Sequence, residues 1–534
     1  MKRFALVASL LALGLTTPIA ASAQAPVNPV SGTSASGVKY LETPVGKKPR
    51  VIITADPELD DSNSMVRYIL HATDYETLGL IYTSSRYHWA GDGKGGTQDL
   101  AIGQYAGLGM CPCTKWRWGP RERFIDDIVD IYETVYPNLK VHDKRYPTPA
   151  RLRAVVRFGN IEFEGDYSKD TPGSDLIKKV LLDDVQEPVY VHAWGGQSSI
   201  ARALKSIEDQ YKNTPQWEAV RRKVIAKTII HASGSQDSTQ DAYIRPTWPE
   251  IRYLRGGGAT GSLAYNAWAG SNIEDAKQFE APWMEAHIND QGPMGRYVRV
   301  WQDGRAAPLG DVFDYFGFYD KDEAQLRKEG FRLFTPQQPA GRFIAEGDTG
   351  TFLPLLDNGL QGWRPENRRG PGQPAPGIMG VAAAATPGAP PAPAAPRPAA
   401  ARRATPNPTQ QPLMNDLAGR LAWSVTPNYK DANHYPTVSI DRARVTAKAG
   451  EVVSLNAKAS DPDGDAVKVE WLKFDGSGSY MPPIVMDKAE GATGSFRVPA
   501  DAKPGDTIHI VAKATDNGKG VPLTWYARTI VTVQ

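Results

Sequence analysis

The stretch Val51-Ile-Ile-Thr-Ala-Asp56-Pro-Glu-Leu-Asp60-Asp61 decides the fold of this 534-residue chain. Apolar, β-favouring residues precede Asp56, and apolar residues recur at helical spacing after Asp61, which predicts a strand followed by a helix. This order is typical of the first unit of a parallel α/β sheet. Ligands of such sheets collect outside the carboxyl ends of the strands, so we expect Asp56, Asp60 and Asp61 to face one pocket.

The three aspartates offer the chemistry of a metal site. Carboxylates that crowd together repel one another, and a bound cation relieves that repulsion. Ca²⁺ fits best, because it accepts six to eight oxygen ligands in a flexible geometry. The alternative interpretation is an acidic turn that caps a helix, since free N–H groups and the helix dipole favour Asp at a helix N-terminus.

Further apolar runs predict how the sheet continues. Strand candidates at residues 50–55, 78–83, 188–193 and 224–231 alternate with helix-like segments. This alternation indicates parallel βαβ units. We therefore expect an α/β domain at residues 48–363, with an open, mostly parallel sheet and helices on both faces.

Composition divides the rest of the chain. A charged start, an apolar stretch and Ala21-Ser-Ala23 predict a signal peptide at residues 1–23, and hence a secreted or periplasmic protein. No later run is apolar enough to span a bilayer, so we expect no membrane span. We expect a polar leader at residues 24–47, a Pro/Ala-rich linker at 364–411 and a connecting segment at 412–435.

Residues 436–534 contain short β-type runs that are separated by Gly, Asp and Pro turns. This pattern predicts an all-β immunoglobulin-like sandwich. Within it, Asp461-Pro-Asp463-Gly-Asp465 offers oxygen ligands for a structural calcium ion. A hairpin-type turn is the alternative for that loop.

Charge and cysteine content narrow the classes of partner. The net charge is +2 and Lys and Arg form no cluster, which argues against a nucleic-acid partner. Cys111 and Cys113 are the only cysteines, too few for a zinc motif. A disulfide across that spacing would be strained, and two buried thiols are the alternative.

The acidic turn resembles the N-terminal signature of the nucleoside hydrolases, Asp-x-Asp-Pro-Gly-x-Asp-Asp, which holds a catalytic Ca²⁺. Asp56, Asp60 and Asp61 match its later aspartates, whereas Thr54 stands at the first aspartate and Glu58 at the glycine. The resemblance implies that Asp56 and Asp61 are calcium ligands. The two departures put the nucleoside specificity in doubt.

Downstream segments extend this resemblance in the same order. Residues 76–89 resemble the second strand and its pocket loop, with Arg86 where the ribose hydrolases have Asn. Residues 189–204 resemble the strand and helix start at which a backbone carbonyl binds calcium, which implies that role for the Trp194 carbonyl. Residues 346–356 resemble the segment with the last carboxylate, so Asp348 is implied as the distal ligand.

The chain is still more similar to the nucleoside-hydrolase-like family that carries a cellulose-binding name and adds a C-terminal β-sandwich. The resemblance covers residues 48–365 and 411–534. It rests on Thr83-Ser-Ser-Arg-Tyr-His-Trp89, Ser235-Gln-Asp-Ser238, Tyr243-Ile-Arg245, Gln291-Gly-Pro-Met-Gly295, Asn415-Asp-Leu-Ala-Gly-Arg420 and Thr515-Asp-Asn-Gly518.

The resemblance implies hydrolysis of a glycosidic bond, with nitrogen as the expected leaving atom. Asp56 would accept the proton of the attacking water, and Asp60 would hold a sugar hydroxyl. Candidate substrate contacts are Arg86, His88, Trp89, Gln236, Asp237 and Asp241. His88 is a candidate proton donor or a hydrogen-bonded wall residue, and the aromatic side chains are candidate stacking surfaces or core.

The expected partner is a small-molecule or carbohydrate glycoside, with a polysaccharide as a candidate ligand of the C-terminal domain and a homo-oligomer left open. Two rival functions remain. One is a non-catalytic carbohydrate-binding protein that retains its metal site. The other is a structural envelope protein, which would not require the distributed carboxylates.

Overall fold

The computed structural model describes residues 32–100, 109, 111–255, 263, 277–303, 323–328, 338–367, 410–474 and 477–534. The expected signal peptide at residues 1–23 lies outside these ranges, as do residues 24–31 of the expected leader and 368–409 of the expected linker. Within the described residues, none of the helices has the length and the apolar character that crossing a bilayer requires.

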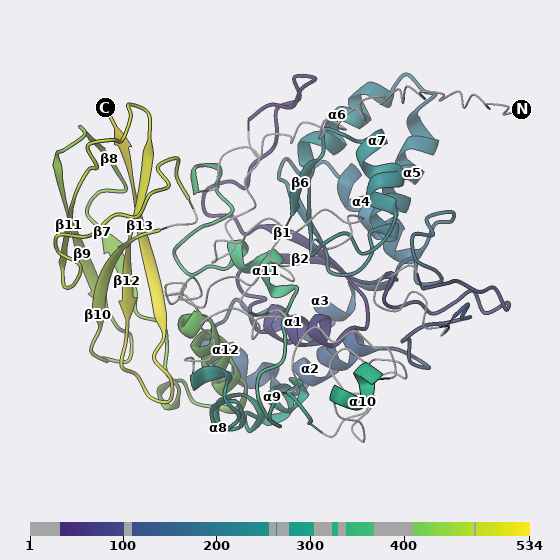
Figure 1. Cartoon of the computed structure of the whole chain (residues 1–534), viewed down its shortest axis with the longest axis horizontal. Coiled ribbons are helices and arrows are strands. Elements are labelled where there is room, and N and C mark those ends of the chain that lie inside the picture. Colours follow the sequence, from purple (N-terminus) through teal and green to yellow (C-terminus); the bar gives the residue numbers. More distant parts are fainter. Residues whose placement is uncertain are drawn as a thin grey trace, which may run out of the picture.

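The first part of the chain folds around a six-stranded parallel sheet in the order β3-β2-β1-β4-β5-β6, which confirms the predicted α/β fold (Figure 1). Its strands are β1 (Arg50–Ala55), β2 (Glu76–Tyr82), β3 (Val156–Phe158), β4 (Val189–Ala193), β5 (Thr228–Ala232) and β6 (Arg252–Arg255). The expected strand at 224–231 was wrong at its start, because residues 224–227 form the last turn of a helix. Val224 and Ile225 are buried there, so a helix end and the following strand merge into one apolar run.

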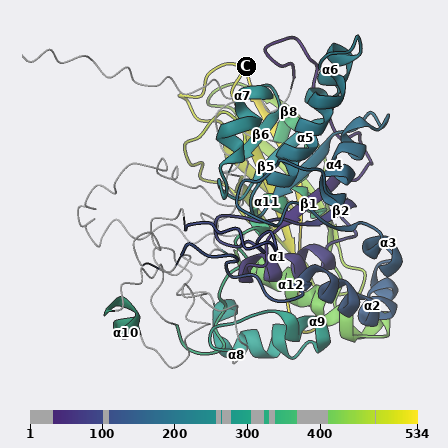
Figure 2. The ribbon, with the colours of Figure 1, turned by 90° about the vertical axis from the view of Figure 1, so that its right-hand side faces the viewer.

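Helices cover both faces of this sheet, as the alternating side chains of the strands require. Val51 and Ile53 join one core and Ile52 the other. Figure 2 shows α4, α5 and α6 on one side of β1 and β2, and α1, α2 and α9 on the other. The longer helices are α1 (Leu59–Leu70), α2 (Phe124–His142), α4 (Pro172–Leu182), α5 (Ser198–Tyr211), α6 (Trp217–Lys227) and α12 (Gln410–Val425).

Short helices fill the connections. They are α3 (Pro149–Arg153), η1 (Gln240–Ile244), α7 (Arg245–Thr247), η4 (Lys277–Phe279), α8 (Ala281–Met284), η5 (Glu285–Asn289), α9 (Gly292–Tyr297), α10 (Glu323–Lys328), α11 (Thr349–Phe352), η6 (Leu353–Leu355), η7 (Pro365–Asn367) and η9 (Tyr429–Asp431).

The C-terminal part is all-β, as expected, and stands at one end of the molecule (Figure 1). A four-stranded sheet, β10-β12-β13-β8, faces a three-stranded sheet, β11-β9-β7, across a shared apolar core. The strands are β7 (Thr437–Ile440), β8 (Arg444–Ala447), β9 (Val452–Ser460), β10 (Lys468–Lys473), β11 (Thr493–Arg497), β12 (Thr507–Thr515) and β13 (Thr524–Val533).

Helix α12 joins the two parts. Arg420 donates to Asp74 at 3.3 Å and to the Leu70 carbonyl at 3.1 Å, which binds α12 to the end of α1. On the other side of α12, Asn415 donates to the Pro522 carbonyl of the sandwich at 3.1 Å. The helix therefore belongs to the packing of both parts.

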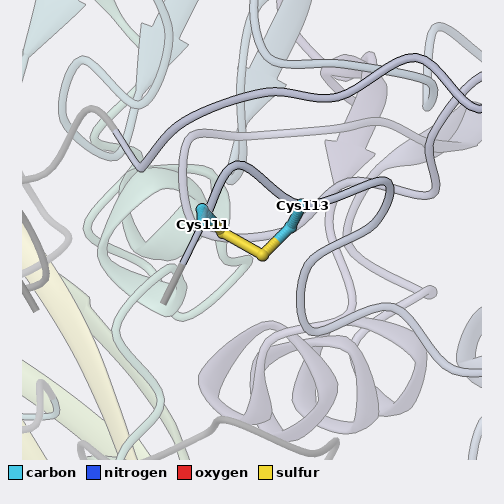
Figure 3. Close-up of a disulfide and its surroundings, with 2 residues drawn as sticks. All are labelled: Cys111 and Cys113. Carbon is cyan, nitrogen blue, oxygen red and sulfur yellow. A yellow bond between two sulfur atoms is a disulfide. The ribbon is translucent and has the colours of Figure 1, made fainter. Parts of the chain in front are cut away.

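Cys111 and Cys113 form a disulfide (Figure 3), which decides between the two states that the sequence left open. The chain beside it pairs with the loop that follows β2. The Gln98 and Cys113 backbones exchange hydrogen bonds at 3.0 Å, and the Trp89 N–H donates to the Trp116 carbonyl at 3.0 Å. The disulfide thus closes a short turn next to the loop that carries His88 and Trp89.

Candidate metal centre and glycoside site

Neighbouring strands end side by side at the carboxyl edge of the sheet. Thr54 of β1 pairs with Ala193 of β4, and Ala193 pairs with Ala232 of β5. The ladder continues past the strands, since the Trp194 N–H donates to the Thr54 carbonyl and the Ser233 N–H donates to the Ala193 carbonyl, both at 2.8 Å. The residues after these strands, Asp56, Trp194 and Ser233, therefore lie at one edge.

Asp56 and Asp61 are held together by the backbone. The Asp56 N–H donates to Asp61 Oδ1 at 3.1 Å, so the Asp61 side chain reaches back from the first turn of α1 toward β1. The residue before α1, Glu58, makes no side-chain capping hydrogen bond. Asp56 is 0% exposed and Asp61 is 1% exposed. The turn is therefore a buried carboxylate cluster and not a solvated helix cap.

Asp348 joins this cluster from far along the chain because α1 holds its segment. The Asn63 amide donates to the Ala345 carbonyl at 2.9 Å, and the Thr349 N–H donates to the Ser64 hydroxyl at 3.1 Å. Arg67 and Glu346, which is two residues before Asp348, form a buried ion pair at 2.5 Å. One face of α1 thus positions the distal carboxylate.

The cluster carries more negative charge than its surroundings neutralise. Burial, followed by repulsion from Asp348, Asp56 and Asp60, raises the pKa of Asp61 well above its usual value. Burial also raises the pKa of Asp348, where hydrogen bonds from Ser233 and Asp61 oppose the rise and the Asp56 charge adds to it.

The acidic side chains also contain oxygen atoms that the protein leaves without hydrogen bonds. Both carboxylate oxygens of Asp56 and Oδ2 of Asp348 are buried and have no hydrogen-bond partner among the described residues. Buried polar atoms are normally satisfied, so such atoms indicate a ligand. Oxygen donors of this kind fit Ca²⁺. Asp56, Asp61 and Asp348 are therefore suitable ligands for a calcium ion.

Glu58 and His88 complete the group, and Glu58 was missed as a member. The His88 Nδ1 atom lies 3.4 Å from Asp56 Oδ2 and 4.0 Å from Glu58 Oε2. Oxygen atoms of Glu58, Asp60 and Asp61 also lie within 4.8 Å of one another. In the sequence, Glu58 stands out only as a departure from the glycine of the family signature. Its place between Asp56 and Asp60 in one tight turn was the available signal.

The Trp194 carbonyl, the expected fourth ligand, faces the Gln236 side chain. The Gln236 amide nitrogen donates to this carbonyl and, at 3.1 Å, to the Ser233 carbonyl. Because both partners are acceptors, the amide nitrogen must face them, which leaves Oε1 buried and without a hydrogen-bond partner among the described residues. A carbonyl oxygen has two lone pairs, so Trp194 retains one for a cation.

Close backbone contact shapes this edge. A Cβ atom added to Gly195 would lie 3.0 Å from Cβ, Cγ and Oδ2 of Asp56, and one added to Gly347 would lie 2.2 Å from Oδ2 of Asp60. The 2.2 Å distance is shorter than real Cβ contacts, and the 3.0 Å distances are tighter than most of them. Glycine at these positions allows the backbone to approach the carboxylates closely.

The expected substrate contacts divide into two groups. His88 lies at the cluster, the Gln236 amide contacts the Trp194 carbonyl, and the Arg86 backbone N–H donates to the Gln236 carbonyl at 2.8 Å. Asp237 is buried and accepts from the Gln197 N–H at the start of α5 at 2.6 Å. The Asp241 side chain is 74% exposed and pairs with Arg245 at 3.6 Å, so the structure does not bring it to the cluster.

The aromatic side chains near the site are buried packing residues. Trp89 and Trp194 are both 0% exposed. The Trp194 indole donates to the Thr351 hydroxyl at 2.9 Å and lies edge-on to Tyr68. The sequence left open whether the aromatic side chains are stacking surfaces or core residues. Trp89 and Trp194 belong to the core.

Comparisons with known proteins agree with this architecture. Residues 50–372 match the family described as "Cellulose-binding Sde182, nucleoside hydrolase-like domain", and residues 452–533 match "Cellulose-binding protein Sde0182, C-terminal domain". A solved structure of a nucleoside hydrolase-related hypothetical protein from Saccharophagus degradans, associated with carbohydrate metabolism, is similar at 23% identity. It has a TM-score of 0.61, and the alignment covers 91% of this chain and 100% of that one.

Two other solved structures align only with a small part of the chain. The PKD domain of human KIAA0319 has 20% identity and a TM-score of 0.14, with 19% of this chain and 83% of that one covered. A marsupial T cell receptor has 18% identity and a TM-score of 0.13, with 18% and 52% covered. No curated protein matches the chain.

Proposed function

Because the chain belongs to the cellulose-binding, nucleoside-hydrolase-like family, we propose that it is an exported, calcium-dependent glycoside hydrolase that cleaves an N-glycosidic bond of a nucleoside or a related glycoside. One observation carries this proposal. Asp56 is fully buried at the carboxyl edge of the sheet, and neither of its oxygens has a hydrogen-bond partner among the described residues. A carboxylate is expected in that state where a cation or a substrate completes its coordination.

The residues that would hold the ion are Asp56, Asp61, Asp348 and the Trp194 carbonyl. When bound, Ca²⁺ would orient sugar hydroxyls and lower the pKa of an attacking water. Asp56 would accept a proton from the attacking water, and Asp60 would accept a hydrogen bond from a sugar hydroxyl. His88 lies next to this carboxylate, with Nδ1 at 3.4 Å from Asp56 Oδ2.

The side chains at the site favour a polar, hydroxyl-bearing substrate. The buried Oε1 of Gln236 is an acceptor that a sugar hydroxyl would satisfy. The backbone of Arg86 contacts the same residue, because its N–H donates to the Gln236 carbonyl. Arg86 replaces the Asn of the ribose hydrolases, so the bound sugar or leaving group differs from theirs in this proposal.

A second candidate function is carbohydrate binding without turnover. The family name favours it, and so does the hydrogen bond from Gln236 to the Trp194 carbonyl, which occupies one lone pair of an expected calcium ligand. No aromatic side chain is exposed among residues 436–474 and 477–534, which argues against a flat polysaccharide-binding surface on the sandwich. We therefore place the first binding site for a sugar at the carboxylate cluster.

The decisive experiment measures sugar release from a panel of nucleosides and other glycosides, with calcium and with a chelator. We expect release by the wild-type chain with calcium, and none from Asp56→Asn. Asp184→Asn is the matched control, because the Asp184 side chain is fully exposed and pairs with Lys223 far from the cluster's residues in the sequence. Release that survives in Asp56→Asn would refute the mechanism. Calcium binding without release from any substrate would favour the carbohydrate-binding function.

A further inference from the structure

A second group of carboxylates lies in the sandwich, between β9 and β10. Carboxylate oxygens of Asp461, Asp463 and Asp465 lie within 4.8 Å of one another. Oδ1 of Asp461 accepts the backbone N–H groups of Asp463 at 2.8 Å and of Asp465 at 3.2 Å. These hydrogen bonds account for the turn. They do not use the second oxygen of Asp461.

Three buried oxygen atoms around this loop have no hydrogen-bond partner among the described residues. They are Oδ2 of Asp461, Oδ2 of Asp516 and Oδ1 of Asn433. Asp516 is 4% exposed and Asn433 is 5% exposed, so water does not readily satisfy them. The Asn433 amide nitrogen donates to Asp516 Oδ1 and to the Val521 carbonyl, both at 3.0 Å, which fixes Oδ1 as the oxygen that points away from these acceptors.

These three residues lie at the same place in the fold. Asn433 is in contact with Asp516, and the next residue, His434, donates its backbone N–H to Asp463 Oδ2 at 2.7 Å. Burial, and then the charge of Asp461, raises the pKa of Asp516, whose hydrogen bonds to Gly518, Asn433 and Leu523 oppose the rise. The Ala466 N–H also donates to Asn517 Oδ1 at 2.9 Å, which holds the loop of Asp461 against the residue that follows Asp516.

We propose that Asn433, Asp461 and Asp516, with the carboxylates of Asp463 and Asp465, form a calcium site that fastens the segment after α12 to the sandwich. All available donors are carboxylate or amide oxygens, which suits Ca²⁺ and disfavours metals that prefer nitrogen or sulfur. Among the described residues, His434 is the basic side chain in contact with these carboxylates, through Asp463 at 3.0 Å. A single imidazole does not balance four carboxylates.

The site would act on the joint between the two parts of the chain. Asn433 and His434 lie between α12 and β7, the first strand of the sandwich. Asp461 follows β9, and Asp516 follows β12. An ion held by all three segments would therefore fix the direction in which the chain enters the sandwich. It is independent of the site proposed in the α/β domain.

The test counts calcium ions bound by the full-length protein, with isothermal titration calorimetry. We expect the double variant Asp461→Asn/Asp516→Asn to bind one calcium ion fewer than the wild type. The control is Asp487→Asn, an exposed aspartate outside the loop, and it should bind as many ions as the wild type. An unchanged count in the double variant would overturn the proposal.

A second measurement leaves the sandwich unaltered. In the variant Asp61→Asn/Asp348→Asn, terbium bound in the sandwich should luminesce on excitation of Tyr429, whose ring stacks on that of His434 with 3.6 Å between centroids. Added calcium should abolish this luminescence. If no calcium-displaceable luminescence is found in this variant, the proposal is wrong.

Discussion

The buried ion pair between Arg67 and Glu346 offers a quantitative test of how α1 positions the distal carboxylate. Arg67 is 0% exposed and the Glu346 side chain is 1% exposed, and two N–H groups of Arg67 contact the two oxygens of Glu346 at 2.5 and 3.2 Å. Arg67 also donates to the Leu413 carbonyl of α12 at 2.8 Å. Replacement of one partner leaves the other charge buried and unpaired.

We expect Arg67→Met and Glu346→Gln each to lower the free energy of unfolding by about 3–5 kcal/mol, the usual cost of breaking a buried pair. The double variant should lose much less than the sum, with a coupling energy of at least about 2 kcal/mol, because no charge is then left unpaired. Urea unfolding followed by tryptophan fluorescence measures these values. Calcium affinity should fall in the single variants, since Glu346 is two residues from Asp348.

The exposed pair between Arg153 and Glu133, at 2.6 Å, is the matched control. Its side chains are 41% and 61% exposed, so the same pair of substitutions should cost no more than about 1 kcal/mol and show almost no coupling. If the losses at Arg67 and Glu346 add to within about 0.5 kcal/mol, the two side chains do not act as a unit and our account of the segment is refuted.

Three further measurements address the rest of the molecule. Burial, with the charge of Arg528, lowers the pKa of His509 from 6.5 to about 3. Stability that is present above pH 6.5 should therefore be lost as the pH falls toward 3, by about 4–5 kcal/mol in all. Thermal unfolding at several pH values should show this loss in the wild type but not in His509→Gln. Gly195→Ala places a Cβ atom 3.0 Å from Asp56 and should weaken calcium binding in titration calorimetry at least tenfold, whereas Gly119→Ala meets only a carboxylate tip and should not. Chelation should lower the unfolding temperature of the wild type, since a ligand at about 100 times its Kd stabilises the fold by about 2.7 kcal/mol; an unchanged temperature would contradict both calcium sites.

Local sequence was sufficient to predict the fold wherever pattern and turn chemistry agreed. Strand β1 and helix α1 follow directly from the apolar run that precedes Asp56 and from the helical spacing of the apolar residues after Asp61. The same method failed at residues 224–227, because a buried helix end has the same apolar character as a buried strand. Periodicity cannot separate these two over so few residues.

The candidate site was predictable only in part, for a physical reason. Asp56, Asp60 and Asp61 lie in one turn, so their proximity follows from the local sequence. Asp348 comes to them through contacts of α1 with residues 345–349, which no local pattern reveals, and only the family resemblance indicated it. The loose sequence similarity around Asp241 likewise could not predict that this side chain lies at the surface.

The two proposed calcium sites are linked through one continuous segment, residues 410–434. Arg67 holds Glu346, beside the first site, and also the Leu413 carbonyl near the start of α12. Eight residues after α12 ends at Val425, Asn433 contributes to the second site. The second ion would therefore fix one end of residues 410–434 directly, and Arg67 links the other end to the segment of the first site. Because α12 also contacts α1 through Arg420 and the sandwich through Asn415, loss of either ion should loosen the contact between the two parts of the protein before it unfolds either one.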